Sequence, residues 1–409
     1  MWPATLEGVG DFNRVLAEEL ERIRATGLHR ELRPVESAQA PVLALQGRQY
    51  LNFSSNDYLG LANDPSLKEA AVEAVGRFGA GTGAARLICG SLRPHQELEE
   101  GLAAFKGTAA ALTFASGYAT AVGTIPALVG RGDLVIVDRL AHASLVDGAR
   151  LSGATLRVFA HNDLDALETV LQRADQRAAG GGPSPAPAPG RRRILVVTES
   201  VFSMDGDLAP LPDLVALKAR YGAWLLVDEA HATGLYGAQR RGVAEAEGVA
   251  SQIEVQMGTL GKALGAAGGF IAGTRVLIDY LVNRARSFMF STAAVPAAAA
   301  AALAALRFVQ SDPGRARCAQ LWERVRQVAS LAGPPTGLSP IFPLILGDEA
   351  EALRAAEVLR TRGLFVPAVR FPTVARGAAR LRLTVTAAHT APQVEHLGEA
   401  LAAIGWPRQ

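Results

Sequence analysis

The sequence predicts an α/β protein: a large domain with a mostly parallel seven-stranded sheet, a smaller C-terminal α+β domain and an N-terminal helical arm. Between about residues 63 and 291, short apolar segments alternate with segments of helical periodicity, which is typical of a doubly wound sheet. The apolar segments are nearly continuous, as expected for parallel strands buried on both faces. Of the 409 residues, 49% are hydrophobic and 20% charged, so the chain can form a large core.

The elements follow in chain order, beginning with the arm over residues 1–55. Apolar residues recur at helical spacing between 11 and 25, and residues 42–53 form a β-like stretch that Gln46-Gly47-Arg48 interrupts. The large domain is expected over residues 56–291. Its seven predicted strands are Ala110–Phe114, Leu134–Val137, Leu156–Phe159, Ile194–Thr198, Trp224–Val227, Val255–Met257 and Gly269–Ala272.

Helices are expected between these strands, for example at 164–173 and 211–221. Residues 178–193 are rich in proline and glycine, which predicts a surface loop without a catalytic role. An alanine-rich helix from 293 to 306 opens the C-terminal domain at residues 292–409. Further helices are predicted near 315–329, 349–362 and 394–404, and strands near 341–346 and 380–384.

Composition argues against several classes of protein. A net charge of +2, with arginines scattered among carboxylates, favours neither nucleic acid nor an anionic membrane as a partner. No run is long and apolar enough to span a bilayer, and acidic residues near the N-terminus argue against a signal peptide. Two cysteines, Cys89 and Cys318, form neither a disulfide framework nor a metal site unaided. We therefore expect a cytoplasmic protein with reduced thiols and no metal.

Lysine usage singles out one residue. The chain has only four lysines among 41 basic residues, and Lys262 lies in the glycine-lined segment MGTLGKALG. A lysine amine can lose its proton and form a Schiff base, which an arginine guanidinium cannot do. A phosphate-binding lysine and a solvated loop lysine are the alternatives.

Further polar residues lie where predicted strands end, the edge at which parallel α/β sheets bind ligands. Asp228 follows a strand directly and can hold a protonated ring nitrogen, or it can cap a helix. Gly117 and Tyr118 begin a helix after a strand, where free N–H groups suit a phosphate. His142 can stack on a flat cofactor or move a proton, although a lone histidine is more often structural.

Two more residues are candidates for ligand contacts. Ser203 follows another strand and can reach a cofactor there. Arg382 lies within an apolar strand, so its guanidinium needs a partner. That partner is either the carboxylate of a bound amino acid or a structural carboxylate.

The chain resembles the α-oxoamine synthases, which are fold-type I enzymes that use pyridoxal 5'-phosphate. The stretches that carry the resemblance are Asn52–Leu61 (NFSSNDYLGL), Arg157–Asp163 (RVFAHND), Phe202–Pro210 (FSMDGDLAP), Val227–Gly234 (VDEAHATG) and Arg380–Thr384 (RLRLT). The resemblance covers nearly the whole chain. The sequence departs from the family pattern at three places. Pro372 after Phe371 is a single proline, Ala85 and Cys89 lie in a glycine-rich stretch, and residues 178–193 are an insertion.

The resemblance implies a role for each matching residue. Lys262 would bind the cofactor covalently, Asp228 its ring nitrogen and His231 its phenolic oxygen, and His142 would stack on its ring. The other implied cofactor contacts are Ser203, Thr259, Gly117, Tyr118 and, toward the phosphate in a partner subunit, Ser291 and Thr292. Arg382 would hold the amino-acid carboxylate. The implied acyl-substrate residues are Arg30, Asn56, Arg370 and Thr373.

The resemblance also implies a reaction and an assembly. It is strongest to the members that condense L-alanine with a pimeloyl thioester, carried by coenzyme A or by acyl carrier protein, in biotin biosynthesis. Members that use glycine are the alternative. A homodimer is implied, because fold-type I sites are built from two subunits. A catalytically silent partner subunit would lack the lysine, and a dinucleotide oxidoreductase would need a Gly-x-Gly-x-x-Gly turn that the first strand lacks.

Overall fold

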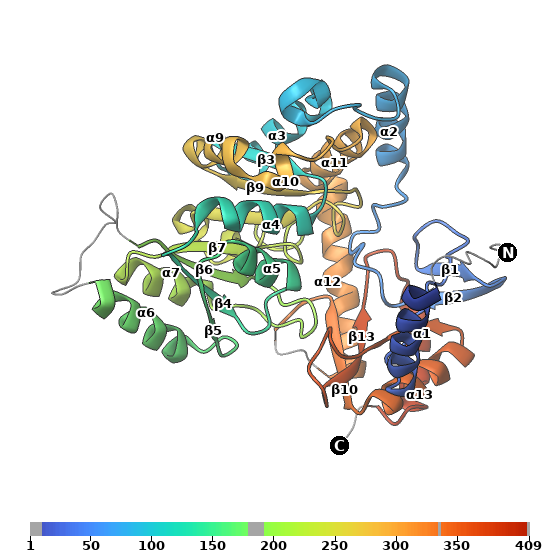
Figure 1. Cartoon of the computed structure of the whole chain (residues 1–409). Helices are drawn as coiled ribbons and strands as arrows, with labels where there is room; N and C mark the ends of the chain where they lie inside the picture. The colour runs from blue at the N-terminus through green and yellow to red at the C-terminus, as the bar shows by residue number, and fades with distance from the viewer. Residues whose placement is uncertain (1–9, 179–191, 334–336, 407–409) are drawn as a thin grey trace.

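The computed structural model describes residues 10–178, 192–333 and 337–406. A seven-stranded sheet with its helices forms the largest part, and a smaller unit of strands and helices lies beside it (Figure 1). The N-terminal segment lies next to this smaller unit (Figure 1). Domain boundaries after residues 55 and 291 stay a prediction.

The large sheet has the strand order β3-β9-β8-β7-β6-β4-β5. All neighbouring strands in it are parallel except for the two pairs that β9 forms with β3 and β8. The strands are β3 (Ala110–Phe114), β4 (Leu134–Asp138), β5 (Thr155–Phe159), β6 (Ile194–Glu199), β7 (Trp224–Asp228), β8 (Val255–Thr259) and β9 (Gly269–Gly273). The predicted mostly parallel seven-stranded sheet is confirmed, with small shifts at the strand ends.

Helices cover both faces of this sheet, because successive strand residues point to opposite sides. Val135 and Val137 of β4 face a core with α4, α5, α9 and α10, whereas Ile136 faces a second core with α3, α6 and α7. The bounds are α3 (Arg93–Lys106), α4 (Gly117–Leu128), α5 (Ala143–Leu151), α6 (Leu164–Ala178), α7 (Leu211–Arg220), α8 (Val243–Ala246), α9 (Arg275–Arg284) and α10 (Arg286–Met289).

The C-terminal region begins with two long helices. The alanine-rich α11 (Pro296–Gln310) packs on α2 (Pro65–Phe78) and on α3. It begins at Pro296 rather than at 293 because proline lacks an N–H and suits the first helical position. The helix α12 (Asp312–Ala332) then leads into the smaller unit (Figure 1).

An antiparallel sheet of order β10-β13-β12 is the centre of the smaller unit. Its strands are β10 (Ile341–Gly347), β12 (Ala368–Val369) and β13 (Ala379–Thr384), and its helices are α13 (Glu349–Thr361) and α14 (Ala391–Ala402). The helices and strands predicted for this region are confirmed with small shifts at their ends. The six residues of β13, Arg382 among them, are all buried.

The N-terminal segment contains α1 (Gly10–Ala25) and the hairpin of β1 (Val42–Leu45) and β2 (Arg48–Asn52), as predicted. Gln46 and Gly47 both have positive φ, which suits a two-residue hairpin turn. The short strand β11 (Leu364–Phe365) pairs in parallel with β2 and so joins the arm to the smaller unit. No residue of α1 is buried. Along this helix, Arg14 forms ion pairs with Asp11 and Glu18.

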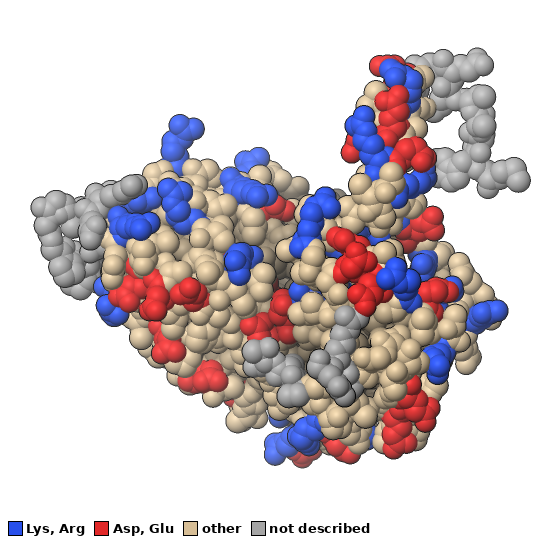
Figure 2. Space-filling model, turned by 90° about the horizontal axis from the view of Figure 1, so that it is seen from below, with Lys and Arg blue, Asp and Glu red and all other residues tan. Residues whose placement is uncertain are grey.

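Residues 179–191 of the predicted proline-rich loop lie outside the described residues. Within the described ranges, no helix is both long and apolar enough to cross a bilayer. Acidic and basic side chains are interspersed over the face in Figure 2, which agrees with the small net charge.

Candidate active site

The predicted site residues gather where parallel strands of the large sheet end. The strands β4, β6, β7 and β8 end at Asp138, Glu199, Asp228 and Thr259. His142, His231 and Lys262 each follow one of these ends by three or four residues. Because the carboxyl ends of parallel strands meet at one edge, these groups lie close together.

Lys262 is half-buried in the loop between β8 and β9. The loop turns sharply, since the Gly265 N–H donates to the Lys262 carbonyl at 2.8 Å. Burial lowers the pKa of the Lys262 amine, and the charges of Asp228 and Glu199 oppose this effect. An amine with a lowered pKa is more readily neutral, as a nucleophile for a carbonyl must be.

Asp228 lies at the end of β7 with 5% of its surface exposed. One of its carboxylate oxygens accepts the Ala230 N–H at 2.9 Å. Burial raises the pKa of Asp228, whereas the nearby Lys262 charge lowers it. A buried carboxylate beside this lysine fits a planar ligand with a protonated ring nitrogen.

His231 belongs to a buried hydrogen-bond chain that includes three other site residues. Its Nδ1 lies 2.6 Å from the Tyr58 hydroxyl, which also lies 3.2 Å from Asn56 Oδ1. Arg382 donates to the same Asn56 oxygen at 3.0 Å and, through Nε, to the Ser203 carbonyl. The structure therefore joins four residues that the sequence predicted separately.

Burial and the hydrogen bond to Tyr58 together determine the protonation state and tautomer of His231. Burial, reinforced by the Lys262 charge, lowers the pKa of His231 well below its ordinary value, so the ring is neutral. The Tyr58 hydroxyl has one proton to donate, to Asn56 Oδ1 at 3.2 Å or to His231 Nδ1 at 2.6 Å; when it donates to Nδ1, the neutral ring carries its proton on Nε2. That N–H is suited to donate to an anionic oxygen, as the predicted role requires.

His142 caps α5 and contacts a carboxylate that the sequence reasoning missed. Its backbone N–H donates to Glu199 Oε1 at 2.6 Å, and its Nδ1 accepts the Ser144 N–H at 3.2 Å. Burial lowers the pKa of His142 and raises that of the almost fully buried Glu199 to about 8. Glu199 ends an apolar strand just as Asp228 does, and this signal could have identified it.

Tyr58 is the second missed residue. It lies about 170 positions from His231 and in no predicted element, so only the fold reveals the contact. Its hydroxyl is fully buried, and burial raises its pKa above the ordinary value for tyrosine. The hydroxyl therefore keeps its proton and can serve as a hydrogen-bond donor at neutral pH.

Gly117 and Tyr118 lie at the N-terminus of α4, where Ser116 caps the helix by accepting the Ala119 N–H at 3.0 Å. A Cβ at Gly269 would lie 2.9 Å from the Gly117 nitrogen, so β9 approaches the helix end very closely. A Cβ at Gly117 would lie 3.7 Å from Thr259 Oγ1. Free N–H groups, the helix dipole and a neighbouring hydroxyl fit a phosphate.

The Tyr118 side chain does not face this helix end. It is half-exposed, and its hydroxyl donates to Asp147 Oδ2 of α5 at 2.9 Å. The predicted backbone contact of Tyr118 with a phosphate is compatible with this orientation.

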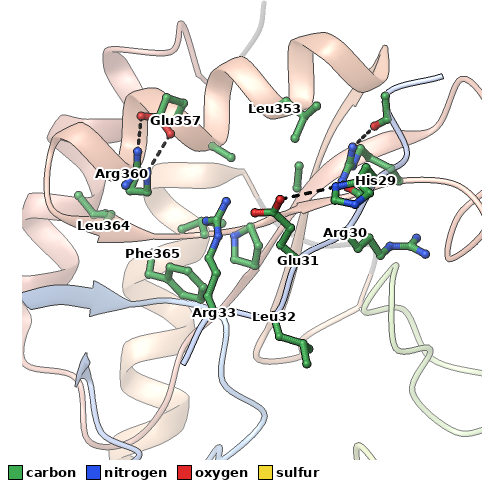
Figure 3. Close-up of a pocket in the computed structure, with 16 residues that line it drawn as sticks. His29, Arg30, Glu31, Leu32, Arg33, Leu353, Glu357, Arg360, Leu364 and Phe365 are labelled. Carbon is green, nitrogen blue, oxygen red and sulfur yellow. Dashed lines mark hydrogen bonds and ion pairs between the residues drawn. The ribbon is translucent and has the colours of Figure 1, made fainter. Parts of the chain in front are cut away.

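Arg30, Arg370 and Thr373 form a separate group. Arg30 donates to the Phe371 carbonyl at 3.1 Å, and Arg370 donates to the carbonyls of Gly27 and His29. These bonds tie residues 27–30 to the loop after β12, next to a pocket of about 580 Å³ (Figure 3). None of the hydrogen bonds seen among the described residues joins this group to Lys262. Asn56, predicted with this group, contacts Arg382 instead.

Ser291 and Thr292 lie after α10. Thr292 forms an isolated β-bridge with Ala85, and Ser291 lines a cavity of about 20 Å³ with Arg86 and His95. Thr292 is exposed, so it can contact a molecule outside this chain. Their predicted contact with a partner's phosphate stays a prediction.

The chain is similar to known proteins over nearly its whole length. The family model described as aminotransferase class I and II matches residues 48–401. Proteins named 8-amino-7-oxononanoate synthase are 51% identical in Anaeromyxobacter dehalogenans, over 95% of both chains, and 49% identical in Geobacter sulfurreducens, over 96% of this chain and 98% of that one. Another from Symbiobacterium thermophilum is 44% identical over 95% and 96%.

Solved structures resemble the whole fold. A serine palmitoyltransferase from S. paucimobilis with a bound PLP–myriocin aldimine has a TM-score of 0.86 at 30% identity, covering 98% of this chain and 99% of that one. An 8-amino-7-oxononanoate synthase from Francisella tularensis has a TM-score of 0.71 at 26% identity, covering 87% and 96%. The predicted fold is confirmed.

Proposed function

The chain belongs to the class I and II aminotransferase family, and on that basis we propose that it condenses L-alanine with a pimeloyl thioester, using pyridoxal 5'-phosphate. The products are 8-amino-7-oxononanoate, CO2 and the free thiol carrier, in a step of biotin biosynthesis. One observation carries the choice of reaction: relatives 44–52% identical to the chain are named 8-amino-7-oxononanoate synthase. We therefore favour L-alanine over glycine as the amino-acid substrate.

The residues at the strand ends fit the cofactor in charge and in shape. When bound, it withdraws electrons from the amino-acid Cα and so permits a carbanion there. Lys262 would hold its aldehyde carbon, Asp228 its ring nitrogen and the Nε2 of His231 its phenolic oxygen. Its ring and phosphate would contact His142, Ser203, Thr259 and the backbone of Gly117 and Tyr118.

The amino acid is oriented by Arg382 and deprotonated by Lys262. The guanidinium of Arg382 is buried, and a substrate carboxylate would pair with it in a two-pronged contact. When it is not bonded to the cofactor, the Lys262 amine, whose pKa burial lowers, can accept the Cα proton of L-alanine. The new carbon–carbon bond then joins this Cα to the thioester carbonyl, and the thiol carrier leaves.

His142 is placed to supply a proton after CO2 is lost. Its Nδ1 accepts the Ser144 N–H, so the neutral ring carries its proton on Nε2. Glu199 fixes the backbone of His142 through the 2.6 Å hydrogen bond, which limits where the ring can lie. The proton of Nε2 can pass to the product carbon as Nδ1 takes up a proton from solvent, so the ring stays neutral; solvent reaches His142 because this residue is exposed.

The acyl substrate is assigned to Arg30, Asn56, Arg370 and Thr373. Arg30 and Arg370 supply positive charge near a pocket whose lining also includes the apolar Leu353 and Leu364 (Figure 3). This combination suits an acyl chain that ends in a carboxylate or is attached to a phosphate-bearing carrier. The carrier is coenzyme A or acyl carrier protein.

We infer a homodimer in the cytoplasm. Large apolar side chains are exposed around Ser291 and Thr292, including Ile88 at 79% and Phe290 at 68% of their surfaces. The apolar face of α1 is exposed as well, with Phe12 at 61%. Apolar exposure of this kind is typical of an interface, and a second copy would cover it and bring Ser291 and Thr292 to a neighbouring phosphate.

A product assay tests the reaction directly. Holoenzyme with L-alanine and pimeloyl-CoA should yield 8-amino-7-oxononanoate by mass spectrometry, whereas glycine should yield little product. If glycine gives the faster condensation, the choice of amino acid is wrong. If neither amino acid reacts with pimeloyl-CoA or with the acyl carrier protein thioester, the proposed reaction is wrong.

The role of Lys262 is tested separately. Borohydride reduction of the holoenzyme should leave a pyridoxyl group on the peptide that contains Lys262. The variant Lys262→Ala should lose this label and turnover, whereas the exposed Lys68→Ala, as control, should keep both. A labelled Lys262→Ala protein would exclude Lys262 as the attachment site.

A further inference from the structure

A buried ion pair lies directly behind the residues assigned to the cofactor ring. Lys106, the last residue of α3, donates through Nζ to Glu229 Oε2 at 2.5 Å and to the Arg241 carbonyl at 2.7 Å. The two side chains are 2% and 0% exposed. Lys106 is one of only four lysines in the chain, and its sequence context, a predicted helix end, assigns it no functional role.

The pair is built tightly into its surroundings. The other Glu229 oxygen, Oε1, accepts the Ala244 N–H at 2.9 Å. A Cβ at Gly242 would lie 2.3 Å from that oxygen, so only glycine leaves room for the carboxylate. A Cβ at Gly107 would lie 2.9 Å from the Arg241 guanidinium, on the other side of Lys106. The backbone on both sides therefore fixes the position of the pair.

Glu229 connects this pair to the active site. It follows Asp228 in the chain, and its N–H donates to the Met257 carbonyl of β8 at 2.9 Å. Its own carbonyl accepts the N–H groups of Ala232 and Thr233 at 2.9 and 2.8 Å. These bonds form the turn on which His231 lies. A shift of Glu229 would therefore move Asp228 and His231 together.

The pair also balances charge beside Asp228. Four titratable groups face Asp228 from the surrounding elements: Lys262, His142, Glu199 and, from the opposite side, Glu229. The negative charge of Glu229 disfavours a charged Asp228, and the ammonium of Lys106 compensates for it. Among the described residues, Lys106 forms side-chain hydrogen bonds only with Glu229 and the Arg241 carbonyl.

We propose that the Lys106–Glu229 pair is a positioning device for the active site, which holds the turn bearing Asp228 and His231 and balances the charge behind Asp228. The proposal rests on the cofactor-binding function proposed above. It assigns no contact with substrate to either residue. Lys106 acts through Glu229. Glu229 acts on Asp228 and His231 through the backbone, and on the charge state of Asp228 through its own charge.

The chain offers a matched control. Lys218 of α7 is also buried and pairs with Glu254, which accepts the Leu225 N–H at 2.8 Å. This second pair lies at the start of β7, whereas Lys106–Glu229 lies at its end. Loss of either lysine removes one ion pair next to an end of β7, but only Lys106–Glu229 adjoins Asp228; the Glu254 side chain is 39% exposed, so the control pair is less buried.

The test is a pH titration of the visible absorbance of the bound cofactor, with the cofactor dissociation constant measured alongside. In Lys106→Met the uncompensated Glu229 should raise the titration midpoint by about one pH unit. In Glu229→Gln the uncompensated Lys106 should lower it. The double variant should return near the wild-type midpoint, and Lys218→Met should leave it unchanged. Both single variants should also bind the cofactor about tenfold less tightly.

Opposite shifts in the two single variants cannot arise from a general loss of stability. Shifts of the same sign, no shift in either variant, or an equal shift in Lys218→Met would overturn the proposal. Glu229→Gln keeps the number of heavy atoms in the side chain, so it gives a reading even if Lys106→Met folds poorly. The titration needs no acyl substrate, and the product assay on the same wild-type sample tests the proposed reaction independently.

Discussion

His161 provides a prediction whose size follows from the structure. Its Nδ1 lies 3.0 Å from Asp138 Oδ1, and its Nε2 lies 2.6 Å from Asp207 Oδ2. The edge of its ring packs on Phe202 at 4.3 Å between centroids. Burial alone would lower the pKa of His161, but hydrogen bonds and charges from Asp138 and Asp207 outweigh it and raise the pKa to about 9. His161 is therefore a charged bridge between Asp138 at the end of β4 and Asp207 in the loop after β6.

The raised pKa predicts how stability depends on pH. The folded protein binds the His161 proton more tightly than the unfolded chain, whose ordinary pKa is 6.5. The stabilisation is therefore complete below pH 6.5 and is lost as the pH rises through about 9. A difference of about 2.5 pKa units corresponds to about 3 kcal/mol. For 409 residues that unfold together, this amounts to about 4 °C in Tm.

The assay compares the Tm of the wild type with that of His161→Gln at pH values from 6 to 10. The variant should melt well below the wild type at pH 6, and the gap should narrow by about 4 °C above pH 9. The Asn162 side chain, which donates to Asp207 Oδ2 at 3.2 Å, remains in the variant, whereas the charge of the imidazolium is lost. His396→Gln, at a histidine whose side chain is 44% exposed, serves as control and should show no such convergence. A gap that stays constant across the range would refute the charged bridge.

Three further predictions concern the active site. Arg382→Lys should raise KM for L-alanine by about 10- to 100-fold, because an ammonium cannot form the two-pronged contact with a carboxylate; an unchanged KM would contradict the assignment. Glu199→Gln should keep the rate at pH 7 nearly unchanged, because glutamine mimics the neutral form of Glu199. It should also remove a titration step near pH 8 from the pH–rate profile, since the pKa of Glu199 is raised to about 8. A pH–rate profile identical to that of the wild type would contradict this assignment. Gly269→Ala should weaken cofactor binding about tenfold, because the added Cβ would lie 2.8 Å from the Gly117 Cα. The control is Gly76→Ala, where a Cβ meets nothing within 4 Å. An equal loss of cofactor affinity in Gly76→Ala would show that the contact with Gly117 is not the cause.

The fold was largely predictable because its strands are buried on both faces. Continuous apolar runs therefore marked all seven strands of the large sheet, and the strand-end rule then pointed to Asp228 and His142. Lysine usage pointed to Lys262, and the family resemblance to His231. Elements without a strong periodic signal were missed. The π-helix Arg86–Gly90 is one, and the two-residue strands β11 and β12 are others.

The contacts of the site were less predictable than its members. Tyr58 and His231, or Arg30 and Phe371, meet across long stretches of chain, so neither contact leaves a local pattern. Glu199 was visible at a strand end, but its bond to the His142 N–H depends on the pairing of β4 with β6. Sequence can therefore identify which residues carry chemistry, and the sheet decides which of them meet.

Burial explains how one site can hold several protonation states near neutral pH. The same loss of water lowers the pKa of Lys262 and His231 and raises that of Glu199. A neutral amine, an imidazole with a defined donor and a protonated carboxyl can therefore coexist within one edge of the sheet. Asp228 must stay charged in this environment to hold a protonated ring. When Lys262 is charged, it favours the charged form of Asp228, and Lys106 offsets the repulsion from Glu229, so Asp228 has support in either state of Lys262.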